Sequence, residues 1–134
     1  MAVITSSAAE RIVDEILSTN DEILAISIID EKGGNIIACR SKESFRKAFG
    51  VTEEASKYGG TLAIASLAVA NEVKEVAGDA LALITVYEKC KMMLLPVPSY
   101  EILVGFVLYS SVNAEDFNIA NKIERLLADI LKSQ

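Results

Sequence analysis

Two short stretches of the sequence hold side chains or main-chain groups that could do chemistry. Cys90 lies between Lys89 and Lys91, and neighbouring ammonium groups lower the pKa of a thiol and so favour the nucleophilic thiolate. Gly59-Gly60-Thr61 precedes a predicted helix, whose free N–H groups can bind an anion, but the Gly-Lys-Ser/Thr ending of a phosphate loop is absent. The chain has no histidine, so a catalytic base would be a carboxylate, lysine, tyrosine or thiolate. A thiol enzyme using Cys90 is therefore one hypothesis, and an ordinary turn thiol is its alternative.

The composition argues against several other kinds of function. Two cysteines, Cys39 and Cys90, without histidine or a CxxC motif do not form a zinc site, and we expect no metal and no cofactor. The net charge of −6 argues against nucleic acid, which needs clustered Lys and Arg. The longest apolar run, 62–70, is far shorter than the roughly 20 residues that cross a bilayer. Residues 1–7 do not resemble a signal peptide, so we expect a cytoplasmic protein without membrane insertion.

A basic and aromatic segment at residues 41–56 stands out in this acidic chain. Its cations and aromatic residues, with the residue before it, are Arg40, Lys42, Phe45, Arg46, Lys47 and Phe49. The two phenylalanines are four residues apart, which predicts a short amphipathic helix that Gly50 ends. One hypothesis is that the segment receives an acidic partner or an anionic surface, and the alternative is a solvated loop pinned by two phenylalanines.

The hydrophobic pattern predicts a single α+β domain over residues 1–134, in the order α-β-β-α-β-β-β-α. The predicted elements are a helix that is capped by Ser6 or Ser7 and ends near Thr19–Asn20, strands 23–29 and 35–40, a central helix that starts between Thr52 and Thr61 and stops at Gly78, strands 80–87, 92–97 and 102–109, and a last helix capped by Asn113. Short loops join the strands, so the five-stranded sheet is antiparallel. Strands that are apolar on both faces need helices on both sides. We therefore expect the first and last helices on one face and the central helix on the other.

The central helix is apolar around most of its circumference. One stripe consists of Leu62, Ser66, Val69, Val73 and Val76, and a second, made largely of small residues, consists of Ile64, Leu67, Ala68 and Asn71. A helix that is buried on one side only shows a single apolar stripe. The second stripe predicts a contact with another subunit.

This order of elements resembles the roadblock/dynein light chain family, a branch of the longin and profilin-like superfold. The resemblance rests on the hairpin 26–37, on the small-residue-rich central helix and on the meander that ends at Tyr109. It implies a non-enzymatic domain that dimerises, with the central helices of two subunits packed together and the third strands paired into one continuous sheet. It also implies a small Ras-like GTPase as partner, for which such domains act as scaffolds or activators, or a role as the light chain of a motor complex. The segment 41–56 is an insert relative to the shorter family members.

The helix pattern and the resemblance together predict a homodimer that scaffolds or regulates a small Ras-like GTPase. The residues expected in the dimer contact are Ile64, Leu67, Ala68, Asn71, Leu83 and Thr85. The alternative is a small-molecule-binding sensory domain of profilin- or PAS-like build. That alternative needs a pocket on the order of several hundred cubic ångströms between helix and sheet.

Overall fold

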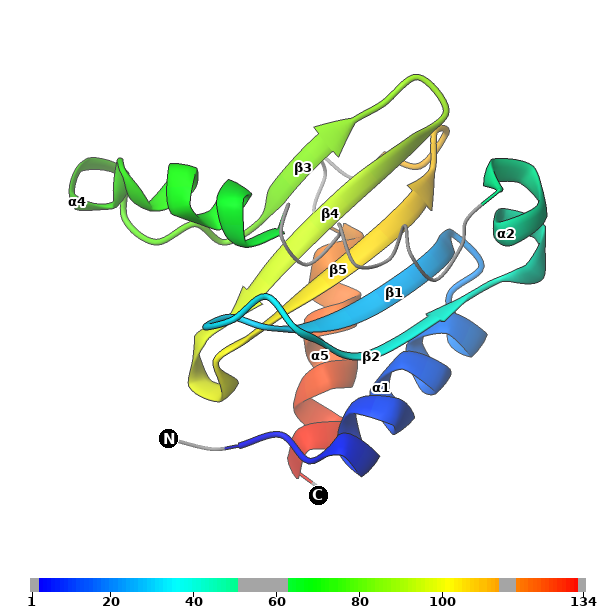
Figure 1. Cartoon of the computed structure of the whole chain (residues 1–134), viewed down its shortest axis with the longest axis horizontal. Helices are drawn as coiled ribbons and strands as arrows, with labels where there is room; N and C mark the ends of the chain where they lie inside the picture. Colours follow the sequence, from blue (N-terminus) through cyan, green and yellow to red (C-terminus); the bar gives the residue numbers. More distant parts are fainter. Residues whose placement is uncertain (1–2, 51–62, 114–117, 133–134) are drawn as a thin grey trace.

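The computed structural model describes residues 3–50, 63–113 and 118–132, and it confirms the predicted fold class and element order (Figure 1). The elements are α1 (Ser6–Thr19), β1 (Ile23–Asp30), β2 (Ile36–Ser41), α2 (Glu43–Phe49), a helix at 63–71, α4 (Lys74–Ala77), β3 (Leu83–Val86), β4 (Cys90–Val97), a 3-10 turn (Pro98–Tyr100), β5 (Ile102–Tyr109) and α5 (Asn118–Lys132). No helix in these residues is long and apolar enough to cross a membrane.

The five strands form one antiparallel sheet in the order β2-β1-β5-β4-β3. β5 lies in the middle, between β1 and β4, and its residues are mostly buried from both sides. This position suits a strand with an apolar run on both faces. β3 is an edge strand with β4 as its neighbour, and it spans four residues instead of the eight predicted for 80–87.

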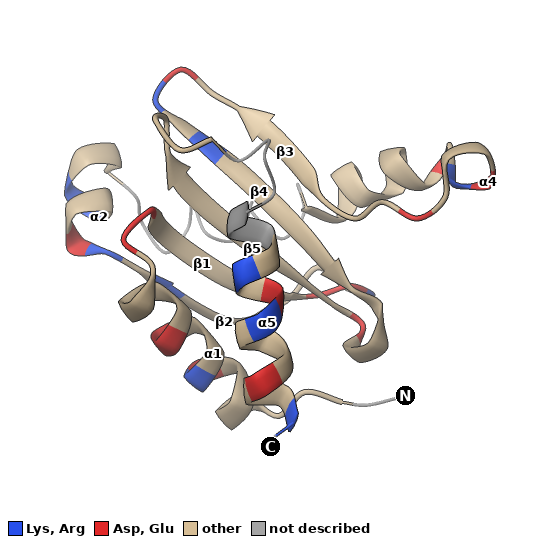
Figure 2. Cartoon of the chain, turned by 180° about the vertical axis from the view of Figure 1, so that it is seen from behind, with Lys and Arg blue, Asp and Glu red and all other residues tan. Residues whose placement is uncertain are grey.

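One face of the sheet is covered by α1 and α5, as predicted (Figure 2). Their buried side chains join those of the sheet in the larger core cluster, which includes Ala9, Ile12, Ile16, Ile26, Met93, Phe106, Ile123, Leu127 and Ile130. The charged residues of both helices lie on the sides turned away from the sheet (Figure 2). The cap of α1 is Thr5 instead of the predicted Ser6 or Ser7: the Thr5 hydroxyl accepts the N–H of Ala8 at 3.0 Å.

The opposite face carries the helix at 63–71, which confirms the predicted layers. Ala63 and Leu67 are buried together with Ile29, Leu94 and Leu103 of the sheet in a second, smaller cluster. The start of the predicted central helix, including Gly59-Gly60-Thr61, lies outside the described residues. So does the stretch between Asn113 and α5, where the predicted cap of the last helix falls.

Two glycines end elements as the sequence predicted. Gly50 caps α2 in the left-handed conformation, with φ of 61°, and so stops the short helix around Phe45 and Phe49. Gly78 follows α4 with φ of 84°, a backbone conformation that residues with a Cβ atom rarely adopt.

The central helix is not continuous, which corrects the prediction of one element up to Gly78. Regular helix ends at residue 71, residues 72 and 73 form a turn, and α4 follows. The amides of Glu72 and Val73 donate to carbonyls three residues back, at 3.2 and 3.4 Å, as in a tightened helix end. All residues from 71 to 79 are exposed, so no packing against the sheet supports a regular helix here.

Candidate interaction surface

Residues 71–79 form an overhang that projects beyond the edge of the sheet (Figure 1). None of the four residues of α4 is buried, and both Val76 in this helix and Val73 at its N-cap are exposed. Short helices are marginal in water, and their stability in proteins comes from packing. An exposed helical turn with two valines is therefore expected to be covered by another surface.

A set of large apolar side chains is exposed on the overhang, on the chain beside it and along the adjoining edge strand. Its members and their exposed fractions are Val69 (72%), Val73 (57%), Val76 (94%), Leu81 (77%), Val86 (62%) and Tyr87 (43%). Single exposed apolar side chains are normal on a protein surface, but a gathering of large ones along one edge marks an interaction site. We call this set the edge patch.

The structure changes which stripe of the helix faces outward. Leu67 is buried against its own sheet and Ile64 packs beside it, although both were predicted in the dimer contact. Ala68 and Asn71, from the stripe predicted in the dimer contact, are exposed. Val69 is exposed as well, although it belongs to the other apolar stripe, which was not assigned to the dimer contact. The period of 3.6 residues revealed two apolar faces, but it did not show which one meets the sheet. The predicted contact through Ala68 and Asn71 stays a prediction.

The two contact residues predicted in the third strand lie in β3. Thr85 is exposed, and Leu83 is half-buried and packs against the smaller core cluster. An edge strand presents unpaired main-chain N–H and C=O groups, which another strand can bind. β3 and the overhang thus lie next to each other on the same side of the molecule (Figure 1).

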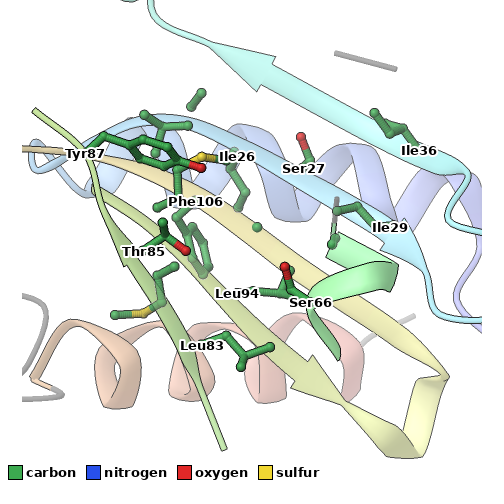
Figure 3. A pocket seen from close by; sticks show the side chains of 16 residues that line it. Ile26, Ser27, Ile29, Ile36, Ser66, Leu83, Thr85, Tyr87, Leu94 and Phe106 are labelled. Carbon is green, nitrogen blue, oxygen red and sulfur yellow. The ribbon is translucent and has the colours of Figure 1, made fainter. Parts of the chain in front are cut away.

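A hollow of about 110 Å³ lies on the sheet face between β1 and β3 (Figure 3). Its floor includes Leu94 and Phe106, and hydroxyl groups line it at Ser27, Thr85 and Tyr87. Pockets for small molecules usually measure about 300–1,000 Å³. The size of this hollow does not favour the alternative of a sensory domain.

The described part of the basic segment lies mainly on α2. The rings of Phe45 and Phe49 lie 5.0 Å apart, with Phe45 buried and Phe49 partly exposed. Lys47 pairs with Glu43 at 3.1 Å, while Arg46 donates to the carbonyl oxygen of Ser41 at 2.6 Å. The structure thus brings these predicted partner residues together, and part of their charge is already compensated.

The side chains of Arg40 and Lys42 bind groups outside α2. The Arg40 guanidinium pairs with Glu10 and, at 3.0 Å, with Asp14, both on α1. The Lys42 ammonium donates to the carbonyl oxygen of Asp21 at 3.1 Å. Arg40 therefore ties β2 to α1, a role that the sequence pattern did not indicate.

Cys90 does not have the environment that a thiol enzyme needs. It opens β4 and is partly buried, and this burial raises the pKa of the thiol. The hypothesis of a thiolate activated by the neighbouring lysines is therefore not supported, and the raised pKa favours its alternative, an ordinary thiol. The Lys91 ammonium donates a hydrogen bond to the carbonyl oxygen of Val112 at 2.6 Å, so this cation already has a partner other than the thiol.

We expect Cys90 to react with iodoacetamide more slowly than a free thiol such as glutathione at pH 8. A raised pKa leaves less thiolate at that pH, and the thiolate is the reactive form. The variant Cys39→Ser isolates the reaction of Cys90, and mass spectrometry over a pH series follows it. A rate above that of glutathione would restore the hypothesis of an activated thiol.

Solved structures share this arrangement along nearly the whole chain. A Roadblock/LC7 domain from Streptomyces avermitilis matches with a TM-score of 0.70 at 7% identity, over 92% of this chain and 95% of that one. The gliding protein MglB from Thermus thermophilus matches with a TM-score of 0.72 at 14% identity, over 98% and 96%. MglB from Myxococcus xanthus matches with a TM-score of 0.71 at 11% identity, over 99% and 94%. The chain has the roadblock/LC7 fold.

The likeness is one of fold, since 7–14% of the residues are identical. No family model and no curated protein matches the sequence. The roadblock/LC7 fold was expected from the element order, and the hairpin and meander that carried the resemblance are β1–β2 and β3–β5 of the structure. The exposed side chains of the edge patch, by contrast, come from the structure.

Proposed function

We propose that this chain is a non-enzymatic interaction module that forms a homodimer and scaffolds or regulates a small Ras-like GTPase. The observation that carries the homodimer is the overhang, a helical turn without a buried residue beside an edge strand. A second copy, placed against the same edge, covers Val73 and Val76 of the overhang and the unpaired main-chain groups of β3 at once. The GTPase follows from the resemblance of the sequence to the roadblock/dynein light chain family.

Self-association of this fold is supported by one further solved structure. It is described as MglB with a tetrameric arrangement and matches with a TM-score of 0.71 at 14% identity. That arrangement belongs to MglB. For this chain it makes assembly through copies of itself a reasonable proposal, which a measurement of mass in solution tests directly.

The test uses the purified chain and then its native cell. One chain has a mass of 14.4 kDa, and light scattering is expected to give twice this mass. The tagged chain is then used to capture partners from a native lysate, with the variant Ala68→Glu as a matched bait that we expect to be monomeric. A Ras-like GTPase enriched on the wild-type bait supports the proposal. A monomeric wild type contradicts the homodimer, and the absence of any such GTPase from the capture contradicts the partner.

A further inference from the structure

β2 forms the edge of the sheet that lies opposite β3 (Figure 1). The N–H of Lys42 donates to the carbonyl oxygen of Leu24 at 2.9 Å, in the register of the ladder that joins β2 to β1. Hydrogen-bonded and non-hydrogen-bonded residues alternate along an antiparallel ladder. Cys39 and Ser41 precede Lys42 by an odd number of residues. Their main-chain N–H and C=O groups therefore point away from β1, toward the outer edge.

Arginine side chains bind both of these outward carbonyl groups. The Nη1 of Arg40 donates to the carbonyl oxygen of Cys39 at 2.8 Å, and the Nη1 of Arg46 donates to that of Ser41 at 2.6 Å. The same Arg46 nitrogen lies 3.0 Å from the hydroxyl of Ser41. Hydrogen bonds from a charged donor are roughly twice as strong as those between neutral groups. A strand that approaches this edge must displace a guanidinium group at each of the two acceptors.

Helices on either side hold the two guanidinium groups in place. Arg40 uses its other nitrogens for α1, where Nη2 pairs with Glu10 and Nε pairs with Asp14 at 3.0 Å. Arg46 belongs to α2 and directly follows Phe45, which is buried. The buried ring fixes the helical turn from which Arg46 reaches back to β2. Each arginine thus has an anchor of its own, independent of the carbonyl group that it binds.

We propose that Arg40 and Arg46 close the outer edge of β2 to strand pairing, as an autoinhibitory contact built into the fold. Proteins blunt exposed edge strands with charged side chains, because an open edge binds strands of other copies. The strand that the opened edge binds is β2 of a second copy of this chain. This inference goes beyond the proposed function and does not depend on the homodimer. It gives two cations that were predicted for a partner a role within the chain.

The double variant Arg40→Ala with Arg46→Ala opens the edge. Size-exclusion chromatography with light scattering, over a series of concentrations, measures species larger than those of the wild type. We expect self-association to become at least about tenfold stronger, since no charge-assisted bond has to be displaced. The variant changes the net charge from −6 to −8, and the added repulsion between copies opposes association. A gain therefore does not come from a lower net charge.

The variant Lys32→Ala with Lys47→Ala is the matched control. It removes the same two charges, but Lys32 pairs with Glu101 and Lys47 with Glu43, both at 3.1 Å. We expect it to associate like the wild type. Equal association of this control and the arginine variant would assign the effect to charge in general and overturn the proposal.

The substitution Cys39→Pro, added to the arginine variant, shows whether the association uses the strand edge. Proline has no N–H to offer to a second strand, and edge strands tolerate it where the N–H points away from the sheet. The N–H of Cys39 points outward, so the ladder to β1 stays intact. We expect C39P to return the variant to the size of the wild type, and association that C39P leaves unchanged overturns the proposal.

Circular dichroism and urea denaturation establish that each variant is folded. If the double variant unfolds, R46A alone carries the test, because it keeps the contacts of Arg40 with α1. A folded variant that associates no more than the wild type overturns the proposal.

Discussion

The substitution Leu67→Glu is expected to lower the free energy of unfolding by about 3–5 kcal/mol. Leu67 is 8% exposed and shares a buried cluster with Ile29, Leu94 and Leu103, so the change removes packed methyl groups and forces a carboxylate against an apolar sheet. Urea denaturation followed by circular dichroism measures the effect.

The neighbouring substitution Ala68→Glu is the matched control for L67E. Ala68 is exposed on the outward side of the same helix, so a carboxylate there stays hydrated in the monomer and costs about 0.5 kcal/mol or less. In the proposed dimer the same carboxylate is buried without a partner, which we expect to abolish dimerisation. The stability of a dimer depends on protomer concentration, so L67E is best compared in the A68E background. Equal destabilisation by both substitutions would show that the assignment of helix faces is wrong.

The substitution Phe106→Ala is expected to cost about 3–5 kcal/mol, because it leaves a cavity in the middle of the sheet. Phe106 is 1% exposed and lies on β5 opposite Ile26 of β1 and Met93 of β4. Its ring belongs to the core cluster that joins the sheet to α1 and α5. The midpoint of urea denaturation should fall. The slope of the unfolding free energy against urea concentration should change little, which indicates an unchanged unfolded state.

Tyr109→Ala serves as the control on the same strand. Tyr109 is 43% exposed at the end of β5, so the loss is expected to be about 1 kcal/mol or less. The contrast between the two aromatic positions tests whether the core lies between the sheet and the pair α1 and α5. Similar losses at both positions would contradict that placement.

Much of the fold was predictable because local patterns and burial agree. β5 was predicted with its observed bounds, since an apolar run of eight residues can satisfy its main chain and its side chains only in the middle of a covered sheet. α2 was predicted from Phe45, Phe49 and Gly50, because four-residue spacing and a left-handed glycine are local signals. In such elements, neighbours in the sequence determine the conformation.

The candidate surface was predictable only in part. The sequence showed that Leu67 and Val69 belong to different apolar stripes, but both stripes satisfy the same helical period. Which stripe meets the sheet depends on how the helix crosses Ile29, Leu94 and Leu103, strand residues far away in the sequence. The choice between an activated and an ordinary thiol at Cys90 was open for a similar reason, because the burial that raises its pKa depends on the fold and not on the neighbouring lysines.

The sequence by itself determined the five strands and their order along the chain, the helices needed on both faces of the sheet, and a central helix with more apolar surface than one sheet can cover. Only the tertiary structure decided that the helix breaks after residue 71, that residues 71–79 lie beyond the sheet, and that β3 is the strand at this edge. The physical reason is that the amphipathic period of an element shows how much of its apolar surface must be buried. Which strand lies at the edge of the sheet depends instead on the order of the strands. Strand order is set by contacts between residues far apart in the chain, such as those between β1 and β5.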